Sequence, residues 1–144
     1  MTESTLSTPA PQAAELLVCV YYRVAGGDTA SAIARVRDIQ RTLADRFDGL
    51  KAEVLVRCEA RAGLSPPAQR DSGASSAPAP AADDTLMETY RLPLPADPAR
   101  PSPGTAIDAP EAARLLGALE SACAPLAPLL RGARHVEVFM PCAS

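Results

Sequence analysis

Histidine, lysine and tryptophan are almost absent from this chain of 144 residues. It has one histidine (His135), one lysine (Lys51), no tryptophan and only two phenylalanines. No apolar run is long enough to cross a bilayer as a helix. With a formal net charge of -3, the chain has no general electrostatic attraction for a phosphate backbone or an anionic membrane surface. We therefore expect neither nucleic acid nor a membrane as its partner.

The four cysteines form no recognised motif. Cys19, Cys58, Cys123 and Cys142 include no CxxC pair and no spacing typical of a zinc site. We expect reduced thiols, no metal and no cofactor. No basic residue precedes the first apolar stretch, as it would in a secretory signal, so the sequence predicts a cytoplasmic protein.

Proline, in contrast, is abundant, and it divides the chain. Two stretches, 61–84 and 93–110, hold ten of the 15 prolines together with alanine, serine and glycine. Segments with so few large apolar groups do not offset the entropy of ordering. We predict loop insertions at 61–84 and 93–107 and a disordered leader at 1–14, with a single domain over 15–142.

Hydrophobic periodicity predicts the order βαββαβ for the rest of the chain. Alternating or β-branched stretches predict strands at 15–24, 51–59, 85–92 and 134–142. Apolar spacings of three and four predict helices at 28–49 and 108–123, the second opened by a capping box of Asp108 and Glu111. This order indicates an α+β, ferredoxin-like fold, in which two helices cover one face of a four-stranded antiparallel sheet. The other face is then uncovered in one monomer.

The uncovered face is expected to carry the polar and aromatic side chains of the strands. From strand alternation we assign to it a ligand or interface set: Tyr21, Arg23, Arg57, Leu86, Tyr90 and Phe139. His135 is expected at the rim beside Arg23, and Glu88 and Glu137 one layer further in, beside Tyr21. Monomers rarely leave such apolar patches in water, so we predict a homodimer that packs sheet against sheet. Its role would be structural, or the binding of a small apolar or aromatic ligand.

Other functions remain open for this face. His135 beside Glu88 or Glu137 would titrate near neutrality, as general acid–base catalysis requires, so a cofactor-independent enzyme is the alternative. A metal held by these three side chains would lack a further ligand. RNA-recognition modules share the βαββαβ order and stack bases at positions like those of Tyr21 and Tyr90, but carboxylates on the same face oppose phosphate binding.

Three strand segments also carry a resemblance to a known family. YYRV (21–24), METY (87–90) and RHVEVF (134–139) resemble a small proteobacterial family catalogued as a domain of unknown function. That family is similar to dimeric α+β barrel proteins, which include antibiotic-biosynthesis monooxygenases, haem-degrading enzymes and muconolactone isomerases. The resemblance implies two ferredoxin-like subunits packed sheet against sheet, and monooxygenase- or isomerase-like chemistry for the enzyme alternative. It identifies no catalytic residue, and the proline-rich loops look like additions to the family's core.

Overall fold

The computed structural model describes residues 14–57, 82–94 and 110–140. Nearly all of the predicted leader and most of the two predicted loops lie outside these residues, as does Asp108 of the predicted capping box. The described elements follow the order βαββαβ, with a short 3-10 helix before α1 and another after α2. They are β1 (Glu15–Val24), η1 (Gly26–Asp28), α1 (Thr29–Ala44), β2 (Lys51–Val56), β3 (Asp84–Pro93), α2 (Pro110–Ala122), η3 (Ala124–Leu129) and β4 (His135–Phe139).

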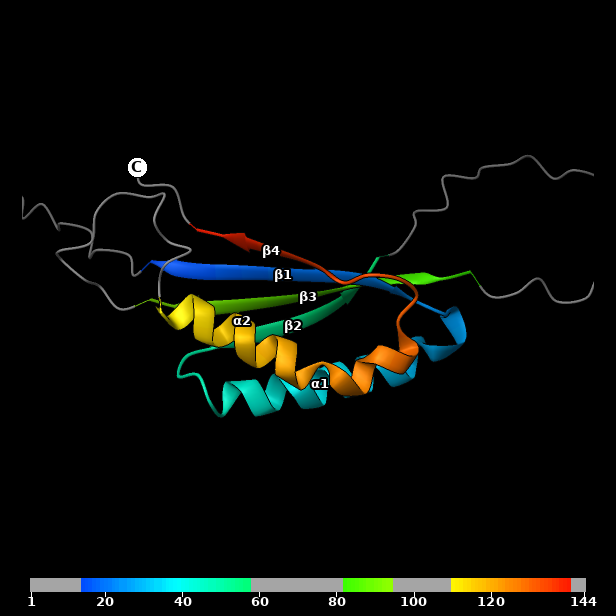
Figure 1. Cartoon of the computed structure of the whole chain (residues 1–144), viewed down its shortest axis with the longest axis horizontal. Helices are drawn as coiled ribbons and strands as arrows, with labels where there is room; N and C mark the ends of the chain where they lie inside the picture. The colour runs from blue at the N-terminus through cyan, green and yellow to red at the C-terminus, as the bar shows by residue number, and fades with distance from the viewer. Residues whose placement is uncertain (1–13, 58–81, 95–109, 141–144) are drawn as a thin grey trace, which may run out of the picture.

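The strands form one antiparallel sheet in the order β2-β3-β1-β4. Both helices lie on the same side of it, and the opposite face carries no further layer of described residues (Figure 1). This arrangement follows from the right-handed connection that each β-α-β unit prefers, which brings both helices to one face. The predicted α+β, ferredoxin-like fold is therefore confirmed.

Helix α1 follows the predicted apolar spacing. Val36, Ile39 and Leu43 are buried against the sheet, three or four residues apart. Asp28 precedes the helix as predicted, but its side chain makes no capping hydrogen bond. The Thr29 hydroxyl instead donates to the Asp84 carboxylate over 2.6 Å, which ties the start of α1 to the start of β3.

The core lies between β1 and the helices. Alternate residues of β1, from Leu16 to Val24, are buried and meet apolar side chains of α1 and α2 such as Val36 and Leu115. Complete burial of one such Leu or Val side chain stabilises the fold by roughly 1.5–3 kcal/mol. Pro125 and Pro128 stand in η3, after α2 ends, and η3 still contributes the fully buried Leu126 to the core.

Strand β3 corrects one prediction. Leu86 and Tyr90, which we assigned to the uncovered face, are completely buried under the helices, and so is Glu88. Their partners on β1 belong to the core face of that strand, and Glu88 lies opposite Val20. Met87 and Thr89 are the residues that face the open side. The strand also extends further than predicted, because Asp84 and Pro93 belong to it rather than to the loops.

Candidate functional site

The open face of the sheet is organised in rows that cross the strands. One row, here called the tyrosine row, consists of Leu55, Met87, Tyr21 and His135. The next, here called the acidic row, consists of Glu53, Thr89, Cys19 and Glu137. We had expected Tyr21 opposite Glu137 and Arg23 opposite His135, so the predicted register was wrong by one cross-strand pair. The hydrophobic pattern is the same after a shift of two residues and therefore does not distinguish these registers.

Tyr21, His135 and Glu137 form a connected group in these two rows. The rings of Tyr21 and His135 stack with centroids 5.5 Å apart and planes 19° apart. The Tyr21 hydroxyl donates a hydrogen bond to Oε1 of Glu137 on the neighbouring strand. This hydrogen bond, followed by burial and the carboxylate charge, raises the pKa of Tyr21 above its usual value of 10.0, so the phenol is protonated at neutral pH.

Cys19 lies directly opposite Glu137 in the acidic row and is half-buried. Burial raises the pKa of its thiol, the charge of Glu137 raises it further, and Arg91 acts in the opposite direction. The thiolate is the nucleophilic form of cysteine. Cys19 is therefore a thiol rather than an activated nucleophile at neutral pH.

Glu88 lies on the other side of the sheet from His135. Its carboxylate is fully buried, accepts a hydrogen bond from the Tyr90 hydroxyl, and has Nη2 of Arg134 at 4.0 Å. The predicted pairing of His135 with Glu88 is therefore wrong, and so is a metal site built on both. The error has a simple cause, since we placed the charged residue on the solvent side although Leu86, Tyr90 and Leu92 mark its face as apolar.

Glu88 belongs instead to a buried polar cluster that we did not predict. The Arg134 guanidinium lies 5.9 Å from the ring centre of Tyr22, whose buried hydroxyl makes no hydrogen bond with the described residues. Burial, and then the charge of Glu88, raise the pKa of both Tyr22 and Tyr90. Strand alternation could have revealed Arg134, because a strand that turns His135 to the open face turns residue 134 toward the helices.

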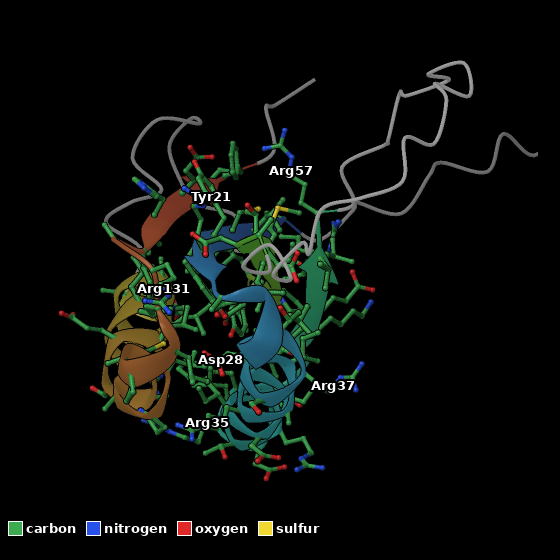
Figure 2. The ribbon with its side chains drawn as sticks, turned by 90° about the vertical axis from the view of Figure 1, so that its right-hand side faces the viewer. Tyr21, Asp28, Arg35, Arg37, Arg57 and Arg131 are labelled. Atoms are coloured by element: carbon green, nitrogen blue, oxygen red, sulfur yellow. The ribbon has the colours of Figure 1, made fainter. Side chains whose placement is uncertain are left out.

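The remaining residues of the predicted set stay on the open face. Arg23 forms an ion pair with Asp83 over 3.3 Å, and Phe139 lies opposite Leu17. Arg57 is exposed, and its backbone amide bonds to Thr85, which is also the partner of Arg23. Figure 2 shows Tyr21 and Arg57 on the side of the sheet away from the helices. Arg57, Thr85 and Arg23 thus form a third row, here called the basic row.

The described residues hold neither a metal-binding cluster nor a membrane-spanning helix. Over 14–57, 82–94 and 110–140, no three His, Cys, Asp or Glu side chains lie close enough together to hold a metal ion. None of the helices described is both long and apolar enough to cross a membrane.

No protein-family model matches the chain, and neither the curated proteins nor the solved structures contain a match. The fold assignment therefore depends on the sheet order and the placement of the helices. The resemblance carried by the strand segments stays a prediction.

Proposed function

We propose that this protein is a homodimer whose open sheet faces pack together and bind a small ligand around Tyr21 and His135. One observation carries the proposal. The open face exposes 45% of Leu55, in its tyrosine row, and no described layer covers this side chain. Apolar groups exposed on one sheet face favour burial against a partner.

Three rows of the face make it complementary to a second copy of itself. The row beyond the acidic row, which consists of Lys51, Arg91, Leu17 and Phe139, lies outside this overlap. Successive rows lie roughly 6.6–6.8 Å apart along the strands. A twofold axis that runs along the tyrosine row places this row on its own copy. The same rotation places each basic row over an acidic row, so that Arg57 on β2 meets Glu53 on β2 of the second copy. Arg23 likewise comes near Glu137, on the strand beside its counterpart.

Such packing would enclose the Tyr21–His135 stack between two sheets. Leu55 and Met87 would line the apolar part of this space, and Glu137 and the His135 ring would supply its polar groups. A mixed lining of this kind suits a small apolar or aromatic ligand. The predicted resemblance to dimeric α+β barrel proteins supports the same assembly. The proposed compartment is the cytoplasm, which would keep the free thiols of Cys19 and Cys123 reduced.

A charge-reversal experiment tests the dimer. The wild type should sediment at twice the 15.0 kDa chain mass. Arg57→Glu and Glu53→Arg should each weaken the dimer, because each puts like charges opposite one another, and the double variant should restore it. Arg114→Glu, at an exposed arginine of α2 on the helix side of the sheet, is the matched control. A wild type that is monomeric at micromolar concentration would remove the basis of the proposal.

A cofactor-independent enzyme is the second candidate, and the Tyr21–His135–Glu137 group favours it. Glu137 is held by the Tyr21 hydroxyl, while the His135 ring makes no hydrogen bond with the described residues and is available to exchange a proton with a substrate. A thermal-shift screen of small aromatic and apolar compounds on the wild type and on His135→Ala detects binding, and mass spectrometry of each bound compound after incubation with both proteins detects turnover. Binding that survives in His135→Ala without turnover supports the ligand-binding dimer, and turnover lost in His135→Ala supports the enzyme.

A further inference from the structure

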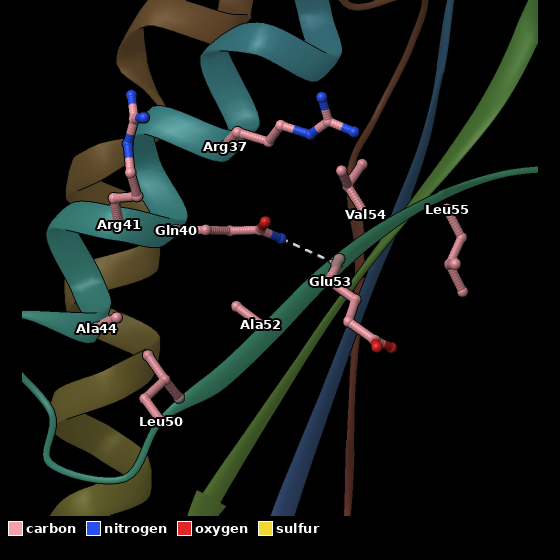
Figure 3. A pocket seen from close by; sticks show the side chains of 9 residues that line it. All are labelled: Arg37, Gln40, Arg41, Ala44, Leu50, Ala52, Glu53, Val54 and Leu55. Atoms are coloured by element: carbon pink, nitrogen blue, oxygen red, sulfur yellow. Dashed lines mark hydrogen bonds between the residues drawn. The ribbon is translucent and has the colours of Figure 1, made fainter.

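An open groove runs between α1 and the edge strand β2 (Figure 3). Its volume is about 660 Å³. The residues that matter here are Arg37 and Arg41 on α1, and Leu50, Ala52, Val54 and Leu55 on or beside β2. The groove thus combines an apolar floor with two guanidinium groups on the helix wall. Glu53 also lines it and belongs to the acidic row of the open face.

The outer edge of β2 is available for pairing. In the described sheet β2 pairs only with β3, and no described strand lies along its other edge. Val56 at its end is 38% exposed, and Leu55 is more exposed still. Gln40 of α1 donates from Nε2 to the backbone oxygen of Glu53 over 2.8 Å, so this one acceptor of β2 is already occupied from the helix side. Exposed strand edges next to a groove are the sites where proteins accept an added strand.

The spacing of the two arginines matches the repeat of a strand. Arg37 and Arg41 are four residues apart on α1, which separates them by roughly 6 Å along the helix axis. Alternate side chains of an extended peptide are separated by roughly 6.6–6.8 Å. Arg41 pairs with Asp38 in an exposed contact that contributes little stability, and Arg37 makes no ion pair with a described residue. Figure 3 shows Arg37 directed toward β2 and Arg41 directed away from it. The Arg41 side chain is 78% exposed, so a turn of this side chain would bring both guanidinium groups to carboxylates at alternate positions of one peptide.

We propose that β2 binds an extended acidic peptide of a partner protein, with carboxylates at alternate positions facing Arg37 and Arg41 and apolar residues between them. The apolar residues turn to the open side, next to Leu55. A second copy of β2 fits this groove poorly, because its helix-facing residues Ala52 and Val54 carry no carboxylate. Pairing two β2 strands would also bring the arginines of two α1 helices toward each other. This inference is independent of the sheet-face dimer, which leaves the outer edge of β2 open.

Fluorescence anisotropy of a labelled peptide tests the inference with the full chain at low ionic strength. The probe alternates glutamate and valine, and a peptide of the same composition in scrambled order is its control. The alternating peptide should bind more tightly than the scrambled one. Reversing both arginines, Arg37→Glu with Arg41→Glu, should weaken binding by about tenfold or more, since two arginine–carboxylate contacts become repulsive. Arg114→Glu with Arg131→Glu changes the net charge equally, involves exposed residues outside the groove, and should leave binding unchanged.

Amide hydrogen exchange gives a second readout, because backbone pairing should slow the exchange of the β2 amides when the alternating peptide is bound. Equal binding of both peptides, or equal loss of binding in both double variants, would show attraction by net charge alone and overturn the inference. A change of oligomeric state in the Arg37 and Arg41 variant, with no peptide binding by the wild type, would mean that a second copy occupies the groove. The two proposals fail separately: a wild type that is monomeric but still binds the peptide would contradict the sheet-face dimer alone.

Discussion

Tyr21 of β1 donates its phenol hydrogen to Glu137 of β4 and thereby ties the two strands together on the open face of the sheet. His135 lies directly opposite Tyr21 in the ladder between β1 and β4. The Tyr21 hydroxyl therefore reaches Glu137 diagonally, in the next row. Diagonal neighbours in an antiparallel sheet lie within reach of long side chains. One aromatic residue therefore positions both the carboxylate and the imidazole of the candidate site.

The first prediction concerns the ionisation of Tyr21. Burial and Glu88 raise the pKa of Tyr22 and Tyr90 far more, so Tyr21 should be the first of the three tyrosines to ionise in the folded protein. Glu137→Gln removes the charged acceptor and should move the midpoint of Tyr21 down toward 10.0. The ultraviolet absorbance of phenolate, followed against pH, measures the order in which the tyrosines ionise and the midpoint of Tyr21. Tyr21→Phe is the control, and a first titration step that persists in it would contradict the assignment.

The second prediction concerns Cys19. Because burial and the Glu137 charge raise the pKa of its thiol, Cys19 should react slowly with an alkylating agent at neutral pH, and faster only toward pH 9 and above. Glu137→Gln should accelerate the reaction at a fixed pH, since it removes one of the two causes. Peptide-resolved mass spectrometry follows each cysteine separately. Cys123, on the opposite side of the sheet, is the internal control, and an equal acceleration there would indicate general loosening of the fold.

The third prediction concerns Glu88 and Arg134. Glu88→Leu should lower the free energy of unfolding by about 1–3 kcal/mol, because it leaves the largely buried Arg134 without its carboxylate. Glu88→Leu with Arg134→Met should recover much of the loss, since apolar replacements of a buried ion pair are often neutral or stabilising. Urea denaturation of the two single variants and the double variant measures the coupling. Additive losses would show that the two charges do not interact.

The fourth prediction compares two buried tyrosines. Tyr22→Phe removes a buried hydroxyl that makes no hydrogen bond with the described residues, so it should be neutral or should stabilise by up to about 1 kcal/mol. Tyr90→Phe removes the donor to Glu88 and should destabilise by about 1–3 kcal/mol. The two substitutions delete the same atom from neighbouring strands, so each is the control of the other. Equal effects would mean that the Tyr90–Glu88 hydrogen bond adds nothing.

The same tyrosines give the protein a dependence on alkaline pH. Their pKa is raised in the folded state, while in the unfolded chain they ionise near their ordinary value of 10.0. Above that pH the unfolded state therefore binds fewer protons than the folded state, and stability falls as pH rises. The wild type should lose stability above about pH 10 more steeply than Tyr22→Phe. A Tyr22→Phe curve parallel to that of the wild type would contradict this origin.

The sequence by itself determined the element order, the core face of β1 and the buried stripe of α1. The reason is that local backbone geometry sets the period of buried residues, which is two in a strand and three to four in a helix. Val18 in β1 and Val36 and Leu43 in α1 follow these periods. The same rule could have placed β3, where Leu86, Tyr90 and Leu92 define the core face. The prediction placed β3 the wrong way round because it assumed that the charged side chain of Glu88 must face solvent.

Only the tertiary structure decided what surrounds each polar residue. The burial of Glu88 depends on Arg134, which is distant in the sequence. Arg134 reaches the Glu88 carboxylate only when β4 pairs with β1. The stack of His135 on Tyr21 depends on a register that a shift of two residues would change without altering any hydrophobic pattern. Periodicity fixes which face a side chain occupies, but the partner across the ladder follows from the packing of the whole sheet. For this reason the face of His135 followed from its sequence, and its neighbours did not.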